Sequence, residues 1–191
     1  MKALAALLLG VAALPAAAQG YAERYATLCA ACHGVTGRST MALAPSLGGQ
    51  PSFYTITQLF LFKNERRKNA AMVALAQNMN DTDLRGFSDV IAKLPPPTPP
   101  ASPASAPDAE RFARGKASAQ RHQCLACHGS DGAGGQQVAR IAHQREDYLL
   151  ESLQGFKAGT RIGYTQAMNE AVAAVRPDEL ADIAHYLAYL Q

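Results

Sequence analysis

Cys29-Ala30-Ala31-Cys32-His33-Gly34 is the stretch that decides the fold, and it returns as Cys124-Leu125-Ala126-Cys127-His128-Gly129. In both copies the two cysteines lie three residues apart and a histidine directly follows the second. Residues i and i+3 share one face of a helical turn, so both thiols point to the same side. The spacing therefore predicts a short helix that presents two thiols and one imidazole to a common neighbour.

The Cys-x-x-Cys-His pattern is the attachment signature of haem c. Its thiols add to two vinyl groups on one porphyrin edge as thioethers, and its histidine meets the iron. Two copies in one chain predict two haem c groups. The residues predicted to attach them are Cys29, Cys32, Cys124 and Cys127, with His33 and His128 as iron ligands.

The cysteines could serve three other purposes. A zinc site needs four suitably spaced ligands, and each copy offers two cysteines and one histidine without a second cysteine pair. A thioredoxin-type pair would need a βαβ context and no following histidine. Structural disulfides would leave both histidines unexplained. Covalent haem attachment accounts for all three residues of each motif.

The two motifs belong to two copies of one longer unit. Matching residues follow each motif in the same order and almost the same register. The matched pairs are Gln50 and Gln144, Tyr54 and Tyr148, Phe62-Lys63 and Phe156-Lys157, Arg67 and Arg161, Met72 and Met168, and Leu84 and Leu180. The repeat is 95 residues long, from Cys29 to Cys124. This length indicates tandem domains, because solenoid repeats are shorter.

A proline-rich segment, residues 95–107, separates the copies. Seven of its thirteen residues are proline and the others are Thr, Ala or Ser. This composition favours an extended linker, which would reach ~40 Å and leave the placement of the domains open. Residues 19–94 and 108–191 are therefore predicted to be two domains, each so small that a bound group would supply part of its core.

Residues 1–18 have the pattern of a cleaved signal peptide. Lys2 is followed by an apolar run and then by the small residues Ala16-Ala17-Ala18. A membrane anchor is the alternative, but a spanning helix needs about 20 apolar residues and this run is shorter. Export to the periplasm is therefore expected.

The fold is expected to be all-α. Leu59, Phe60 and Phe62 lie in one amphipathic stretch, and Tyr148, Leu149, Leu153 and Phe156 recur at helical spacing in the other copy. Asn80-Asp81 and Pro177-Asp178-Glu179 predict the starts of the two final helices. The second of these helices is predicted to bury Leu180, Ile183, Ala184 and Leu187.

A sixth iron ligand separates an electron carrier from a catalyst. Met72 and Met168 follow the motif histidines at nearly equal distances, 39 and 40 residues, and are predicted to fill this position. Met79 aligns with Val175 and is expected in the core. Met41 lies too close to His33 to wrap around the ring. The other histidines, His122, His143 and His185, are expected at the surface or in packing.

The groups that orient the axial histidines can also be predicted. The carbonyl group of Pro45 lies on the loop after the first motif, where it can accept the Nδ1 proton of His33. Ala139 takes this place in the second copy and offers a carbonyl group without the stiffness of proline.

Charge argues against a nucleic-acid partner. The net charge is only +3, and the basic residues are scattered along the chain. Residues 19–94 hold eight Lys or Arg against five Asp or Glu, whereas residues 108–191 hold nine against ten.

The paired motifs, the loop from Pro45 to Gln50, the Phe-Lys-x-x-x-Arg stretch and the methionines some 40 residues on resemble class I cytochrome c domains. Two such domains in tandem resemble the dihaem cytochrome c4 family. The resemblance implies an electron carrier rather than an enzyme. It implies redox-protein partners: a quinol-oxidising cytochrome bc-type complex and a terminal oxidase or reductase. Any membrane association would be peripheral and would come through these partners.

Two other functions stay open. One is a dihaem electron-transfer subunit of a periplasmic dehydrogenase of the flavocytochrome type. The other is an enzyme of a peroxidase or thiosulfate-oxidising type, which needs an open or reactive sixth site, and the two methionines argue against it.

Overall fold

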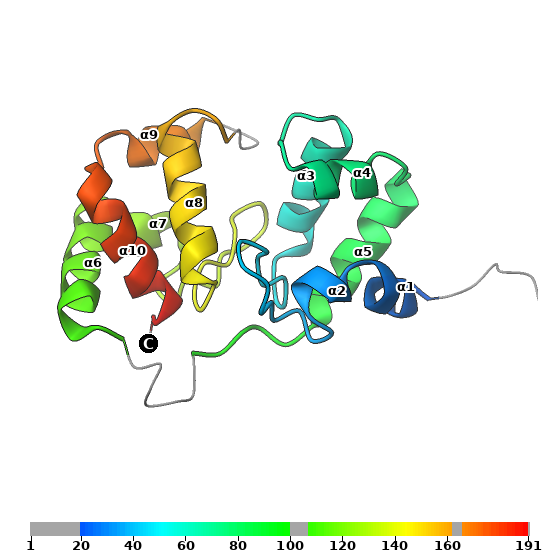
Figure 1. The fold of residues 1–191 in the computed structure, drawn as a ribbon, viewed down its shortest axis with the longest axis horizontal. Coiled ribbons are helices and arrows are strands. Elements are labelled where there is room, and N and C mark those ends of the chain that lie inside the picture. The colour runs from blue at the N-terminus through cyan, green and yellow to red at the C-terminus, as the bar shows by residue number, and fades with distance from the viewer. Residues whose placement is uncertain (1–19, 100–106, 162–165, 191) are drawn as a thin grey trace, which may run out of the picture.

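Ten α-helices form two groups in the computed structural model, which describes residues 20–99, 107–161 and 166–190 (Figure 1). The first group contains α1 to α5 and the second α6 to α10. The predicted all-α fold is confirmed, and the described residues contain no strand. The helices are α1 Tyr21–Leu28, α2 Ala30–His33, α3 Ser52–Lys63, α4 Ala70–Ala76, α5 Asp81–Lys93, α6 Ala109–Arg121, α7 Cys124–His128, α8 Glu146–Lys157, α9 Ala167–Ala173 and α10 Pro177–Ala188.

In the first domain, α1 and α3 pack against α5. The predicted start of α5 is confirmed, because Asn80 and Asp83 form a capping box with each other's backbone N–H groups. Leu59 and Phe62 are buried beside Phe87 of α5. Phe60 lies in the same amphipathic stretch, but its side chain is half exposed. One residue along a helix turns the side chain by about 100°, here away from the core.

The second domain is built on α10, which packs against α6 and α8. Pro177 is its first residue, as predicted, and the Glu179 carboxylate accepts a hydrogen bond from the Arg176 N–H group. The predicted buried face of α10 is confirmed: Leu180, Ile183, Ala184 and Leu187 are all nearly inaccessible to solvent.

A glycine permits the close helix crossing in each domain. A Cβ atom on Gly115 of α6 would lie 2.0 Å from the Asp182 carbonyl oxygen of α10. A Cβ atom on Gly86 of α5 would lie 2.3 Å from the Tyr21 ring of α1. Any larger side chain would push these helices apart, so both crossings depend on the missing Cβ atom.

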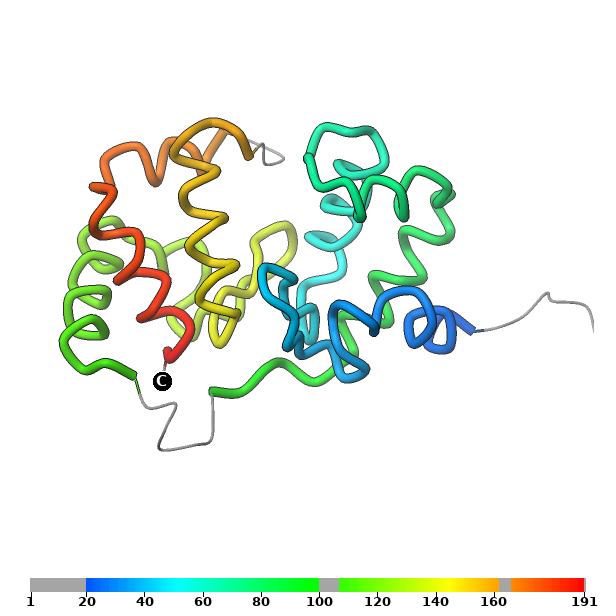
Figure 2. Tube along the Cα trace, viewed as in Figure 1, coloured from blue at the N-terminus to red at the C-terminus, as the bar shows by residue number. Residues whose placement is uncertain are grey.

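The two domains contact each other through the loops that follow their Cys-x-x-Cys-His turns. Figure 2 shows these loops side by side between the helix groups. The N–H group of Tyr54, at the start of α3, donates to the carbonyl oxygen of Gln136 at 3.0 Å. The Leu43 N–H group donates to the Asp147 carboxylate at 3.1 Å. The composition of the linker did not predict how the two domains are arranged. The structure shows that they contact each other directly.

The start of the linker also belongs to this junction. The side chain of Arg38 donates to Thr98 Oγ1 at 3.1 Å. Pro97 is buried, and its carbonyl oxygen accepts from His143 Nδ1 of the second domain at 3.0 Å. Pro97 and Thr98 therefore attach the start of the linker to both domains. Linker residues 100–106, and the predicted signal peptide 1–18, lie outside the described residues.

Among the described helices, none is long and apolar enough to cross a membrane.

Candidate haem-binding sites

Each Cys-x-x-Cys-His motif forms one helical turn, α2 in the first domain and α7 in the second. All four cysteines are free thiols. Cys29 is buried and Cys124 half-buried, whereas Cys32 and Cys127 are exposed. Each pair therefore places one thiol inside the domain and the other at its edge, so a group bound by both would have one exposed edge.

Burial raises the pKa of the Cys29 thiol to about 11 and raises that of Cys124 in the same way. The inner thiols are therefore protonated at neutral pH and are not reactive thiolates by themselves.

The two motif histidines are oriented as predicted. His33 Nδ1 lies 2.8 Å from the Pro45 carbonyl oxygen, and His128 Nδ1 lies 2.8 Å from that of Ala139. A carbonyl oxygen only accepts, so Nδ1 carries the proton and Nε2 keeps its lone pair. Burial lowers the pKa of both imidazoles and keeps them neutral. A neutral imidazole with an available Nε2 atom is the form that ligates iron.

The two predicted methionine ligands occupy equivalent short helices. Met72 lies in α4 and Met168 in α9, and both are half-buried beside their domain cores. The Asn69 side chain caps α4 by accepting from the Met72 N–H group. Met79 and its counterpart Val175 are buried in the two cores, as expected of packing residues. Met41 is half exposed.

A cluster of two arginines and a tyrosine spans the domain junction. Arg67 Nη2 and Arg161 Nη2 donate to the Tyr148 hydroxyl oxygen at 2.8 Å and 3.2 Å. Burial by itself would raise the pKa of Tyr148, but the two guanidinium groups outweigh burial and lower the pKa to about 7. Each guanidinium also stacks on an aromatic ring, Arg67 on Phe62 and Arg161 on Phe156.

Sequence reasoning aligned Arg67 with Arg161 but missed this cluster. In the part of the chain that the structure describes, neither guanidinium contacts a carboxylate. Half-buried guanidinium groups without a carboxylate partner suit an anionic ligand. Haem c carries two carboxylates on the edge away from its thioethers. The thiol pairs, the neutral imidazoles and these cations therefore form a donor set that fits haem c in both domains.

The remaining histidines contact groups of the protein itself. His185 is buried, and its Nδ1 atom lies 2.8 Å from Glu146. His122 Nε2 lies 3.6 Å from the Glu179 carboxylate. His143 lies between two carbonyl oxygens, those of Pro97 and Leu190.

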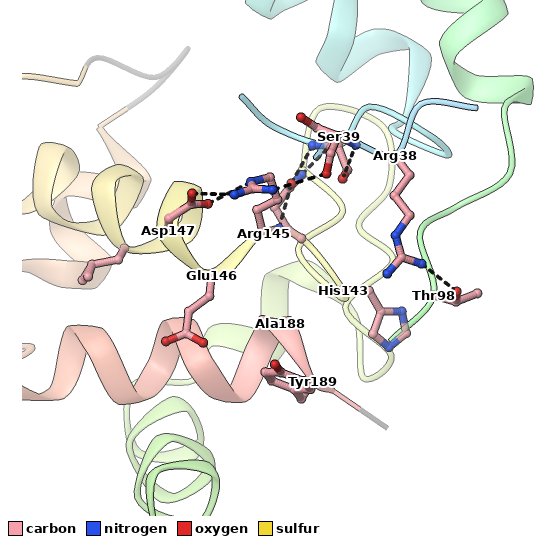
Figure 3. Close-up of a pocket in the computed structure, with 12 residues that line it drawn as sticks. Arg38, Ser39, Thr98, His143, Arg145, Glu146, Asp147, Ala188 and Tyr189 are labelled. Carbon is pink, nitrogen blue, oxygen red and sulfur yellow. Dashed lines mark hydrogen bonds and ion pairs between the residues drawn. The ribbon is translucent and has the colours of Figure 1, made fainter. Parts of the chain in front are cut away.

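A cavity of about 580 Å³ lies at the domain junction (Figure 3). Figure 3 shows Arg38, Thr98 and His143 on one side and Arg145 with Asp147 on the other. The two side chains of the last pair form an ion pair at 2.7 Å. None of the predicted haem ligands lines this cavity, so it is separate from the haem-binding residues.

The sequence matches the cytochrome c family twice, over residues 18–94 and 112–191. It is 32% identical to cytochrome c-552 of Acidithiobacillus ferridurans, over 96% of this chain and 84% of that protein. It is also 32% identical to cytochrome c4 of Thiocapsa roseopersicina, over 84% and 85%. The identity to the thiosulfate dehydrogenase electron acceptor of Stutzerimonas stutzeri is 30%, over 98% and 93%.

Solved structures agree with these relatives. The cytochrome c4 structure of Acidithiobacillus ferrooxidans superposes with a TM-score of 0.74 at 30% identity, covering 86% of this chain and 99% of that one. A thiosulfate dehydrogenase from Marichromatium purpuratum gives a TM-score of 0.74 at 27% identity, covering 87% of this chain but only 40% of that one. Two domains of this type hold two haem c groups and transfer electrons. The chain belongs to the cytochrome c family, as a tandem, dihaem member of the cytochrome c4 type.

Proposed function

We propose that the chain is a periplasmic one-electron carrier without bond chemistry of its own. Each domain would attach one haem through its cysteine pair and ligate the iron with a histidine and a methionine. The first set is Cys29, Cys32, His33 and Met72, and the second is Cys124, Cys127, His128 and Met168. The bound haem iron supplies the chemistry, a one-electron change between ferric and ferrous states.

The observation that carries this proposal is the matched state of the two histidines. In both domains Nδ1 donates to a loop carbonyl oxygen at 2.8 Å, so the ring is held in one tautomer. With haem bound, a fixed imidazole and a thioether would hold the iron at a high potential relative to bis-histidine ligation. Such a site exchanges electrons but has no open position for substrate.

The ligation is tested by spectra of the purified, haem-loaded chain. Both ferric haems should show the long-wavelength charge-transfer band of methionine ligation, and the ferrous protein should not bind carbon monoxide at once. Rapid carbon monoxide binding by one or both haems would contradict the closed-site assignment and favour an enzyme.

The physiological partners would be a quinol-oxidising cytochrome bc-type complex as donor and a terminal oxidase or reductase as acceptor. A second candidate function is to accept electrons from a periplasmic dehydrogenase. It is favoured by the relative named as an electron acceptor for thiosulfate dehydrogenase. Mixing the oxidised chain with a purified thiosulfate dehydrogenase and thiosulfate separates the two: rapid reduction supports the second candidate, and no reduction supports the first.

Electrons would pass to and from partners mainly through the first domain. Leu28 and Val35 flank its cysteine turn and are 49% and 74% exposed. The second domain has the polar residues Gln123 and Ser130 at the same two places, and these are exposed as well. An apolar patch beside a redox centre is a typical feature of weak electron-transfer contacts.

The charge of the first domain indicates the kind of partner. With eight basic against five acidic side chains its protein charge is +3, whereas nine against ten give the second domain −1. A domain with a net positive charge attracts a redox partner whose surface is acidic. We therefore expect an acidic redox protein to dock over the Cys29–His33 turn.

A pair of double variants tests this docking face. The Leu28→Gln/Val35→Ser variant gives the first domain the side chains of the second. It should slow electron transfer from a reduced acidic blue-copper protein several-fold, because the apolar contact is lost. The matched control, Gln123→Ala/Ser130→Ala, alters the equivalent face of the second domain and should leave the rate unchanged. An equal slowing in both variants, or none in the first, would contradict docking on the first domain.

A further inference from the structure

Two buried glutamines cross the domain junction in opposite directions. Gln144 of the second domain donates from Nε2 to the Ser46 carbonyl oxygen at 2.8 Å and accepts at Oε1 from the Ser46 N–H group at 2.7 Å. Gln50 of the first domain makes the same two contacts with Arg140, at 2.8 Å and 3.0 Å. The side chains are 4% and 5% exposed, so water does not compete for these bonds.

Each glutamine binds the peptide group that orients the other domain's axial histidine. The N–H group of Ser46 and the carbonyl group of Pro45 belong to one peptide bond. That carbonyl oxygen accepts from His33 Nδ1 at 2.8 Å, so the amide is bonded to His33 on one side and to Gln144 on the other. A continuous hydrogen-bonded path thus runs from the histidine of the first domain to a glutamine of the second.

The mirror path has the same geometry. The Ala139 carbonyl oxygen accepts from His128 Nδ1 at 2.8 Å, and the Arg140 N–H group of the same peptide bond donates to Gln50 Oε1 at 3.0 Å. The two paths are related by the repeat, because Gln50 aligns with Gln144 and the loop residues align in turn. Two independent copies of one path argue against a chance contact.

The physical effect follows from the peptide group itself. Its nitrogen lone pair is delocalised onto the oxygen. When the N–H group donates a hydrogen bond to the glutamine, the carbonyl oxygen of the same peptide group therefore becomes more negative and a better acceptor. A better acceptor at Nδ1 makes the imidazole a more basic ligand. A more basic ligand stabilises ferric iron and lowers the reduction potential.

We propose that Gln144 and Gln50 are positioning residues that tune the haem of the opposite domain: Gln144 acts on haem 1 through Pro45–Ser46 and His33, and Gln50 acts on haem 2 through Ala139–Arg140 and His128. The proposal rests on the assignment of the two histidines as axial ligands. Docking of the domains then sets both potentials, and each domain senses whether its partner is in place.

The experiment is a redox titration of the haem-loaded full chain followed by NMR. The haem methyl resonances are assigned to each domain with the variants Met72→Ala and Met168→Ala. Gln144→Leu keeps the side-chain size and removes the acceptor oxygen, so the midpoint potential of haem 1 should rise more than that of haem 2. Gln50→Leu should give the reverse pattern. A simple proximity effect would instead act mainly on the haem of the substituted domain.

Gln144→Glu provides a second test if the Leu variant loosens the junction. It replaces the amide oxygen by a stronger, charged acceptor, so the potential of haem 1 should fall, again more than that of haem 2. Asp147→Asn is the control, because its contact with the Leu43 N–H group crosses the junction without reaching either histidine. It should not produce the crossed pattern.

Equal shifts at both haems in the Gln144 variants, or larger shifts at haem 2, would overturn the proposal. This failure is distinct from failure of the proposed function. The latter would appear as fewer than two haems per chain or loss of methionine ligation in the unsubstituted protein.

Discussion

Substituting Gly115 by alanine should destabilise the second domain, because α6 and α10 touch backbone to backbone at this glycine. The new Cβ atom would lie 2.0 Å from the Asp182 carbonyl oxygen and 2.8 Å from Tyr186 Cβ. Ordinary contacts begin at about 3.4 Å, so α10 would have to move by roughly 1.4 Å. A backbone carbonyl cannot rotate out of the way as a side chain can.

The magnitude follows from two opposing effects. Overpacking costs about 1–3 kcal/mol, and the backbone clash places Gly115→Ala at the upper end of this range. Replacing glycine by alanine inside a helix returns about 0.8–1 kcal/mol. The net loss is therefore about 2 kcal/mol, equivalent to a fall of about 8–16 °C in the Tm of a domain of this size.

Thermal unfolding of the haem-loaded chain, followed by circular dichroism and haem absorbance, measures this loss. Gly155→Ala on α8 is the control, since its Cβ atom would lie 3.1 Å from Arg161 Cβ and otherwise make ordinary contacts at 3.6 Å or more. The control should change stability by less than ~1 kcal/mol. A Gly115→Ala protein as stable as the parent would show that the two helices do not cross as closely as described.

Three further predictions concern a carboxylate, a loop and the methionines. The Arg176 N–H group, with Ser118, lowers the pKa of Glu179 to about 2, below its ordinary value near 4.5. Its stabilising effect is therefore complete above about pH 4.5 and lost as the pH falls toward 2, so the stability gap between Glu179→Gln and the parent should close over that interval in acid titrations. Pro45→Ala should leave the haem 1 potential nearly unchanged, because Ala139 makes the same 2.8 Å contact in the second domain, and should cost about 0.4–1 kcal/mol in denaturant unfolding through the entropy of the unfolded chain. Met72→Ala and Met168→Ala should each remove about half of the methionine charge-transfer band and open one iron to carbon monoxide; an unchanged spectrum would exclude that residue as a ligand.

The local parts of the fold could be predicted from the sequence because they depend on neighbours along the chain. The cap at Asn80, the proline start at Pro177 and the buried face of the last helix are of this kind. The histidine acceptors were also predictable, because the repeat aligns Ala139 with Pro45 and a backbone carbonyl needs no particular side chain.

Features of the domain junction could not be predicted in the same way. The reciprocal contacts of Gln50 and Gln144 join residues 90 and 98 positions apart, so they exist only once both domains are folded and docked. The meeting of Arg67 with Tyr148 likewise depends on docking. The packed start of the linker was missed because proline-rich composition reports stiffness but not what the segment packs against.

The central claim is that each domain attaches its own haem through its own cysteine pair. The most direct test combines the intact mass of the exported chain with a pyridine haemochrome count, for the parent and for the variants Cys29→Ser/Cys32→Ser and Cys124→Ser/Cys127→Ser. The account predicts two covalent haems in the parent and one in each variant. A parent with fewer than two haems, or a variant that keeps both, would contradict it.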